Sequence, residues 1–279
     1  MNIRLVSLPN PRQKSAASIT ACLILLCSLF ILNAMIDETG LGTDLGRRYL
    51  APGHGSILGT DWLGRDMFTR ITKGLCMSFH IGIMSAIGSS LIAVIMGLAA
   101  AVFGKKVDAI VALLIDAFLS VPHIVLLILV SFTLGGGFKG IVIAVCVSHW
   151  SRLARIIRAE ILQLKGSDYI MMSYRLGRSR RWIMAHHMLP HVSSQFLIGL
   201  ILMFPHAILH AAGLSFLGFG MTPDRPCIGV LLSESMRHIS TGYWWLALFP
   251  GAALVALVKI FDVIGENASR MLNPRTKQE

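Results

Sequence analysis

Two histidines in one apolar run have the spacing that points most directly to chemistry. His206 and His210 stand four positions apart, so their rings lie on one face if the run is helical. Two imidazoles placed in this way can bind a borderline-soft cation such as nickel. The alternative is a pair of structural histidines that form hydrogen bonds between neighbouring helices. The spacing alone leaves both interpretations open.

A second group of polar residues lies in a glycine-rich stretch nearer the N-terminus. It contains Asp61, Gly64, Arg65 and Asp66. The two carboxylates could contact a substrate or a partner protein. We favour hydrogen bonding within a tight turn, because Asp side chains readily accept hydrogen bonds from nearby backbone amides.

The other histidines and the cysteines predict no site of their own. His186, His187 and His191 are expected to be ordinary interface residues. We assign no role to the remaining five, which are His54, His80, His123, His149 and His238. The five cysteines lack CxxC spacing, which argues against a disulfide framework or a zinc site.

The elements that must position these residues are membrane-spanning helices. The 279-residue chain is 54% hydrophobic and 14% charged, whereas soluble domains carry about 25% charged residues. Its apolar runs are long enough to cross about 30 Å of hydrocarbon. We predict an all-α, polytopic membrane protein with six transmembrane helices, over about 15–35, 77–103, 109–134, 140–153, 192–216 and 244–264. A cleavable signal peptide is the alternative for the first run.

The distribution of basic residues predicts the orientation of these helices. The net charge of +11 would suggest nucleic-acid binding in a soluble protein. In a membrane protein it fits the enrichment of Lys and Arg on the cytoplasmic side. With the N-terminus inside, sixteen basic residues fall in cytoplasmic segments and eight in outer segments, with Lys259 in the last span. We therefore expect cytoplasmic N- and C-termini, contact with membrane lipid and no nucleic-acid partner.

Charges and prolines within the spans indicate helices that pack around a cavity. Asp116, Lys259 and Asp262 are expected to form structural pairs, with a transport role as the alternative. Three of the predicted spans contain a proline, namely Pro122, Pro205 or Pro250. Because a broken hydrogen-bond ladder is costly against lipid, these breaks should face protein or a cavity. This pattern suggests a transporter or a channel.

The long basic segment between the fourth and fifth spans predicts helices outside the membrane. An apolar stripe predicts that the fourth helix continues into the cytoplasm; it comprises Leu153, Ile157, Ile161 and Leu164. Ser167 is expected to cap a helix that starts at Asp168 and ends at Gly177, a typical left-handed C-cap. A further helix, capped by Ser179, is expected to run to Leu189-Pro190.

The helix expected at 168–176 carries large apolar side chains outside the bilayer. A helix of this kind fits a groove in a partner protein. The alternative is an interfacial helix lying on anionic lipid, with its neighbouring arginines near the headgroups.

This loop resembles the coupling loop of type I ABC importer permeases, which has the pattern EAA…G…LP. Gly177, Leu189 and Pro190 match in type and spacing, whereas Met171-Met172-Ser173 replaces Glu-Ala-Ala. In that family the loop docks onto the ATPase subunit. The resemblance implies an ATPase-coupling role for Ser173, Gly177, Leu189 and Pro190.

Two other segments are similar to permeases for dipeptides, oligopeptides and nickel. Residues 58–66, Leu-Gly-Thr-Asp-Trp-Leu-Gly-Arg-Asp, with Phe68 and Arg70, match the family segment LGTDxLGRDxFSR. Residues 214–220, Leu-Ser-Phe-Leu-Gly-Phe-Gly, resemble LSFLGLG, although Ile228-Gly229 stands where the family has Trp-Gly.

The position of Asp116 and Pro122 also fits the family pattern, and the segment with the two histidines resembles the nickel-permease branch. The resemblance implies that nickel or a metal chelate is the cargo, with a di- or oligopeptide as the alternative.

The resemblance also implies an architecture and a set of partners. We expect a MetI-like permease fold in the bacterial inner membrane, with an N-terminal helix and outer segment (1–76), a permease core (77–266, coupling loop about 166–191) and a basic cytoplasmic tail (267–279). The expected partners are a homologous second permease, two ATP-binding subunits and an extracytoplasmic solute-binding protein.

The chain contains no GxxxxGK[ST] motif, so ATP and Mg are expected to be used by a partner. We expect the chain itself to be no enzyme and to bind no cofactor. Outside this class, an ion-channel subunit or a lipid-surface scaffold are the alternatives.

Overall fold

The computed structural model describes residues 11–53 and 55–272, and it is all-helical within them, without a β-strand. The long helices are α1 (Pro11–Met35), α2 (Met67–Val102), α3 (Lys105–Ser120), α4 (His123–Thr133), α5 (Gly137–Lys165), α8 (Leu189–Phe216) and α10 (Trp245–Leu272). Shorter helices are α6 (Asp168–Arg175), α7 (Arg180–Ile183) and α9 (Ile228–Met236). Single turns complete the set, namely η1 (Glu38–Leu41), η2 (Leu45–Arg47), η3 (Met184–Met188) and η4 (Ile239–Thr241). The first ten residues and most of the predicted basic tail lie outside the described residues.

Five helices are long and apolar enough to cross a membrane. They are Arg12–Met35, Met67–Val102, Gly137–Lys165, Gln195–Phe216 and Trp245–Met271. The pair α3 and α4 provides a sixth crossing if the two helices count as one broken span. This set agrees with the six predicted spans, and α2, α5 and α10 extend well beyond the predicted bounds.

The third predicted span is not one helix, which corrects the expectation of a single crossing over 109–134. The axes of α3 and α4 meet at 96°. Pro122 causes the break, because it has no amide hydrogen and excludes a helical conformation for the residue before it. Val121 is accordingly extended, with φ −78° and ψ 134°.

The cytoplasmic part of α5 follows the predicted apolar stripe. Leu153, Ile157, Ile161 and Leu164 are all buried, and the helix ends at Lys165. Against them pack α2, α3 and the loop that follows α5. The fourth span is thus the membrane part of a 29-residue helix, because one continuous apolar face supports both parts.

The helix expected to end at Leu189-Pro190 instead leads directly into the fifth span. After α7, a π-helical turn at Met184–Met188 joins it to α8, which begins at Leu189. Pro190 lies in the first turn of α8, directly after the π-helical turn. The expectation of a helix end here was wrong, because a local π-helical adjustment lets a helical chain continue past a proline.

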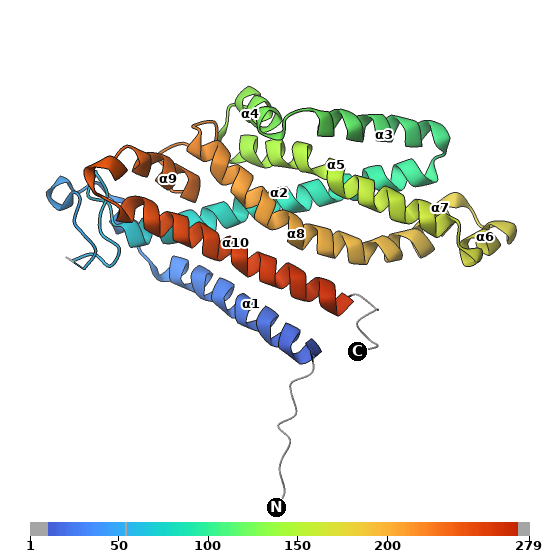
Figure 1. Ribbon diagram of the computed structural model, residues 1–279, viewed down its shortest axis with the longest axis horizontal. Coiled ribbons are helices and arrows are strands. Elements are labelled where there is room, and N and C mark those ends of the chain that lie inside the picture. Colours follow the sequence, from blue (N-terminus) through green and yellow to red (C-terminus); the bar gives the residue numbers. More distant parts are fainter. Residues whose placement is uncertain (1–10, 54, 273–279) are drawn as a thin grey trace, which may run out of the picture.

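The helices form an elongated bundle in which α2, α5 and α8 run along the middle (Figure 1). The α3–α4 pair lies on one side of this group, and α1 with α10 lies on the other. Close packing joins them: the rings of Phe204 in α8 and Phe261 in α10 stack with centroids 3.6 Å apart. A Cβ on Gly97 of α2 would lie 2.7 Å from Ile157 of α5, so a glycine is needed at this crossing.

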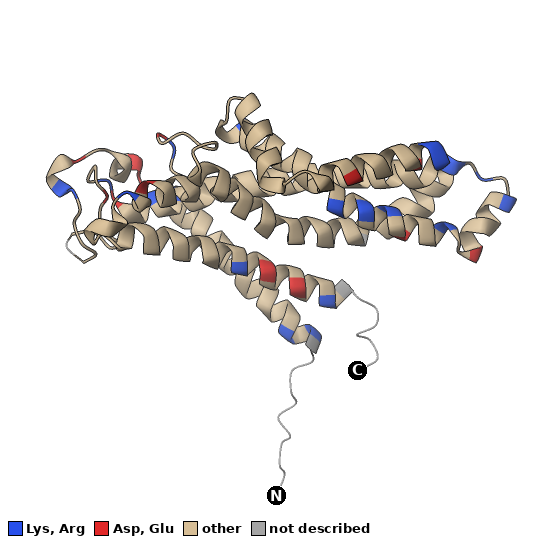
Figure 2. Ribbon diagram, turned by 45° about the horizontal axis from the view of Figure 1, so that its top comes forward, with Lys and Arg blue, Asp and Glu red and all other residues tan. Residues whose placement is uncertain are grey.

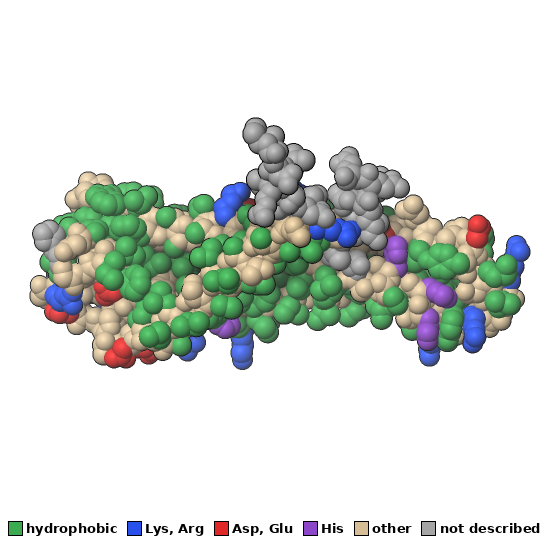
Figure 3. Space-filling model, turned by 90° about the horizontal axis from the view of Figure 1, so that it is seen from below, with side chains coloured by type: hydrophobic (Ala, Val, Ile, Leu, Met, Phe, Trp, Pro, Cys, Tyr) green, Lys and Arg blue, Asp and Glu red, His purple; other side chains and the backbone are tan. Residues whose placement is uncertain are grey.

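Charge and hydrophobicity follow the long axis of the bundle. Figure 2 shows Lys, Arg, Asp and Glu gathered at the end opposite α6 and over the half of the bundle that carries α6, with fewer between these two groups. Hydrophobic side chains cover most of the face seen in Figure 3. The helix α6 lies at one end, and the start of α1 and the end of α10 lie on the same half of the bundle, closer to its middle (Figure 1). This arrangement is that of a bundle whose two ends face water and whose middle faces lipid.

Candidate functional site

A cavity of about 620 Å³ opens between the α3–α4 break and the helices α5 and α8. Its walls are mostly apolar, and its polar groups include Arg152 and four histidines: His123, His149, His206 and His210. A largely apolar cavity with a few convergent polar groups is the usual form of a small-ligand site. It is therefore the candidate cargo site of this chain.

Three separate helices bring the cavity histidines together. His123 is the first residue of α4 and follows Pro122 directly, so the break that bends the span also places this ring in the cavity. His149 comes from the middle of α5, and His210 comes from α8. Their convergence thus depends on the packing of all three helices.

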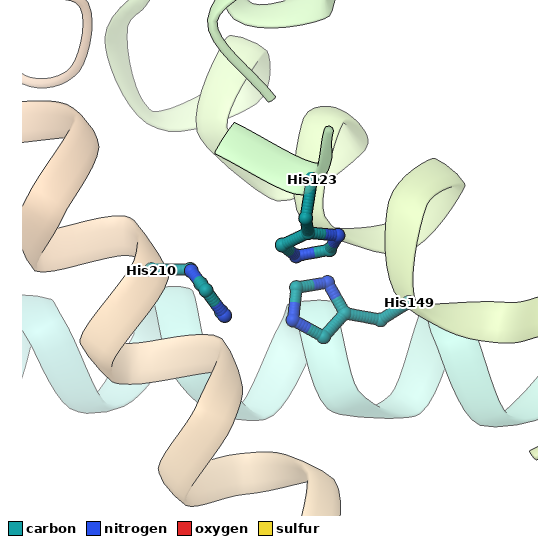
Figure 4. Close-up of side chains that lie close together, drawn as sticks. All are labelled: His123, His149 and His210. Carbon is teal, nitrogen blue, oxygen red and sulfur yellow. The ribbon is translucent and has the colours of Figure 1, made fainter. Parts of the chain in front are cut away.

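The rings of His123, His149 and His210 form a close group (Figure 4). One ring nitrogen from each lies within 4.8 Å of those of the other two. The ring centroids are 4.5 Å apart for His123–His149, 4.5 Å for His123–His210 and 5.0 Å for His149–His210. The rings meet edge to face, at interplanar angles of 64–80°.

Only one residue of the predicted pair His206/His210 belongs to this group of rings. Both residues line the cavity, as their spacing on one helix face requires. His210 joins the close group, whereas His206 is exposed and is not part of it. The partners of His210 are His123 and His149, to which we had assigned no role. Helical spacing cannot reveal them, because they lie on other helices.

Two ring nitrogens of the group are buried without a hydrogen-bond partner among the described residues. Nδ1 of His149 lies 3.1 Å from the carbonyl oxygen of Val145 and 3.0 Å from Oγ of Ser148. Nε2 of His149 and Nε2 of His123 are buried and have no hydrogen-bond partner among the described residues. A buried nitrogen without a partner costs about 1–3 kcal/mol, so a ligand that satisfies both would stabilise the group.

The coupling-loop residues lie at the end of the bundle that carries α6. Ser167 occupies the N-cap position of α6 without a side-chain capping bond, because its hydroxyl donates to the carbonyl of Leu164 instead. Gly177 follows the C-cap with φ +77°, the left-handed conformation predicted for it. Ser179 caps α7 by accepting a hydrogen bond from the amide of Trp182.

The surface of α6 is apolar and faces outward. Ile170 is fully buried against the core, whereas Tyr169, Met171 and Met172 are exposed, and Leu176 just beyond the helix is 74% exposed. Large exposed apolar side chains outside the spans mark a contact surface for another molecule.

The predicted coupling residues do not gather into one contact. Ser173 donates to the carbonyl of Tyr169 and lies 3.4 Å from Nε2 of His187. Leu189 and Pro190 are exposed in the first turn of α8, separated from α6 in the chain by α7 and the π-helical turn.

The predicted outer-segment residues form a buried ionic network at the opposite end. Asp61 is 1% exposed, and its Oδ2 lies 2.6 Å from both Arg65 Nε and Arg70 Nη1. Both arginines also reach Glu234 of α9, at 3.2 Å and 2.8 Å. Glu234 was not identified from the sequence, because its contact with the motif spans more than 160 positions. The network joins the outer segment to α9.

Asp66 and Gly64 shape the entry into α2. Asp66 is the N-cap of α2 and accepts hydrogen bonds from the amide and hydroxyl of Thr69. Gly64 has φ +78°, and a Cβ there would lie 1.7 Å from the carbonyl oxygen of Asp44. Both residues thus have evident structural tasks in this turn.

The charges predicted to pair near the ends of the spans do so. Arg155 of α5 lies 2.8 Å from Asp116 of α3, and Lys259 lies 3.4 Å from Asp262 within α10. A third pair, Arg158 with Asp108, also joins α5 to α3. The pairs Arg155–Asp116 and Arg158–Asp108 connect α3 to the cytoplasmic part of α5.

Comparison with known proteins agrees with this architecture. Residues 89–278 match the family described as "Binding-protein-dependent transport system inner membrane component". A putative peptide transport system permease protein of Brucella abortus is 35% identical over 237 residues, which cover 85% of this chain and 79% of the relative. The dipeptide transport system permease protein DppC of Bacillus subtilis is 30% identical over 271 residues, which cover 96% and 85%. The oligopeptide transport system permease protein OppC of Bacillus subtilis is 32% identical and covers 79% and 72%.

Solved structures show the same fold. A structure of the inward-facing MetNI methionine ABC transporter superposes with a TM-score of 0.61 at 18% identity, over 74% of this chain and 98% of that one. An amino acid ABC transporter with histidines gives a TM-score of 0.55 at 18% identity, over 74% and 95%. The chain therefore belongs to the family of inner membrane components of binding-protein-dependent transport systems, which are multi-pass permease subunits of ABC importers in the bacterial inner membrane.

Proposed function

We propose that this permease subunit imports di- or oligopeptides through the cavity between α3, α4, α5 and α8. The support comes from relatives across most of the chain, which are named as dipeptide, oligopeptide and peptide permeases. The cavity also supports the proposal, because its apolar walls can accommodate varied peptide side chains and its Arg152 can bind a peptide carboxylate. Family membership sets aside the ion-channel and lipid-scaffold alternatives.

The proposed complex needs subunits that this chain does not supply. Because the sequence has no phosphate-binding loop, ATP and Mg are used by ATPase subunits, which we propose to be two. A homologous second permease would supply the other half of the pathway, and an extracytoplasmic solute-binding protein would deliver the peptide.

Coupling to the ATPase is proposed to run through α6. Its exposed Met171, Met172 and Tyr169 form a compact apolar surface, and a helix of this kind can lie in a groove of the ATPase. The Gly177 turn determines where α6 ends and the chain returns to the bundle. A shift of α6 on ATP binding would reach the cavity through α7 and α8, which continue from the loop.

Arg152 offers the sharpest test of the proposed cargo. It projects from α5 at the cavity wall and is exposed, so its guanidinium can pair with a peptide carboxylate. A hydrogen bond to a charged group contributes about 1.5–3 kcal/mol, which corresponds to roughly 10- to 150-fold in affinity. We expect Arg152→Ala to raise the KM for dipeptide uptake by about tenfold or more, with an unchanged amount of permease in the membrane.

Arg155→Ala is the matched control for this test. Arg155 lies one turn further along α5 and outside the cavity lining, in an exposed pair with Asp116. Exposed pairs contribute about 0–1 kcal/mol, so this variant should transport normally. Equal KM values for Arg152→Ala and the wild type would contradict the proposed contact.

Nickel or a metal chelate is the second candidate cargo. The names of the relatives refer to peptides, which favours the peptide. The observation that supports a metal cargo is the group of His123, His149 and His210 at the cavity. Measuring nickel and dipeptide uptake in the same cells separates the two candidates.

A further inference from the structure

We infer that His123, His149 and His210 form a binding site for a divalent transition-metal ion that enters from the cavity. The inference concerns the chain itself and holds whether the transported cargo is a peptide or a metal. It starts from the convergence of three imidazoles from three helices on one point (Figure 4).

The distances between the rings are close to those of a metal site. With metal–nitrogen distances of about 2.0–2.1 Å, the ligand nitrogens of a tetrahedral site lie roughly 3.3 Å apart. The three candidate nitrogens lie within 4.8 Å of one another. Metal binding therefore requires the rings to rotate toward a common centre. The edge-to-face ring geometry allows each ring to direct a nitrogen to a shared centre.

The hydrogen bonding of the group fits metal ligands. In metal sites, a ligating histidine usually donates its second ring N–H to a carbonyl or carboxylate, which orients the ring. Nδ1 of His149 is placed for this donation, 3.1 Å from the carbonyl oxygen of Val145. A proton on Nδ1 leaves a lone pair on Nε2, and this atom is buried without a partner among the described residues, as is Nε2 of His123.

The ligand set selects the class of metal. Imidazole suits zinc, copper, iron and nickel, whereas magnesium and calcium prefer oxygen ligands. Three histidine ligands leave at least one coordination position for water or another group, as in open zinc sites.

Metal binding to the purified permease tests this inference, with Ni²⁺ alone as the probe. The full chain, reconstituted in lipid nanodiscs with its partner subunits, should bind one Ni²⁺ per chain, and excess Mg²⁺ should not compete. His149→Ala, His123→Ala and His210→Ala should each weaken binding at least tenfold. His80→Ala is the control, because His80 of α2 lies outside the cavity lining and outside the close group, with its Nδ1 2.6 Å from the carbonyl oxygen of Cys76. It should leave Ni²⁺ affinity within about twofold of the wild type.

A second measurement needs no variant. X-ray absorption at the nickel edge of the wild-type complex should show three imidazole ligands. Absence of Ni²⁺ binding, fewer than two imidazoles at the bound ion, or full binding in a variant lacking all three histidines would overturn the inference. Peptide uptake by the same preparations is a separate readout, so failure of the metal site and failure of the proposed peptide transport remain distinguishable.

Discussion

Asp61 is the residue of the outer segment on which most interactions converge. Its carboxylate contacts Arg65 and Arg70 and accepts hydrogen bonds from the amides of Leu63 and Arg65. Two arginines and two carboxylates therefore share one nearly buried network with Glu234. Within such a network, the loss of one member leaves the others charged and unpaired, which is far costlier than the loss of an exposed pair.

We predict that Asp61→Ala lowers the free energy of unfolding by about 3–5 kcal/mol, because it removes a carboxylate partner from the buried Arg70 and the partly buried Arg65. Thermal unfolding of the purified protein in detergent measures this change. Asp37→Ala is the control, since Asp37 caps only the exposed turn η1. Equal melting temperatures for the two variants would show that the network does not stabilise the fold.

The histidine group could be predicted from the sequence only in part. The spacing of His206 and His210 correctly predicts two rings on one helix face, and both line the cavity. The close partners of His210 are His123 and His149, and no periodicity relates them to it. Their approach depends on how α4, α5 and α8 pack, which a single sequence does not encode in local spacing.

Among the elements, local signals predicted helix ends well where the chemistry of one residue decides them. Ser179 caps α7, and Gly177 adopts the left-handed turn. Proline was harder to interpret. Pro122 separates two helices by 96°, whereas Pro190 opens α8. The same missing amide hydrogen breaks the chain in one place and is accommodated next to a π-helical turn in the other, so tertiary packing decides between them.

The left-handed turn at Gly177 gives a prediction for α6. A residue with a Cβ in this conformation costs about 1–2 kcal/mol, which corresponds to a factor of about 5–30 in the population of the docked loop. We expect Gly177→Ala to lower ATP-driven uptake several-fold while the permease still inserts and still binds its ATPase.

Gly166→Ala provides the comparison within the same loop. Gly166 has φ −79°, which alanine adopts without strain, and an added Cβ meets only the carbonyl of Gln163 at 3.4 Å. Its uptake should equal that of the wild type. If Gly177→Ala transported as well as Gly166→Ala, the conformation of this turn would not matter for coupling.

For the whole molecule, hydrophobicity and charge were the most informative properties of the sequence. Long apolar runs predicted the spans, because lipid allows only helices or closed barrels with satisfied backbones. The excess of basic residues predicted one common side for the termini and the loop at α6. In the structure the start of α1 and the end of α10 lie on the same half of the bundle as α6, although α6 alone is at its end (Figure 1). The cargo was beyond such reasoning, because it depends on the lining of a cavity that four helices build together.

Uptake of labelled dipeptide, measured beside uptake of labelled nickel in cells with and without this chain, tests the central claim most directly. We expect deletion to abolish energy-dependent dipeptide uptake, and the wild-type chain to restore it. Unchanged dipeptide uptake after deletion, with nickel uptake lost, would contradict peptide import and make the metal the transported cargo.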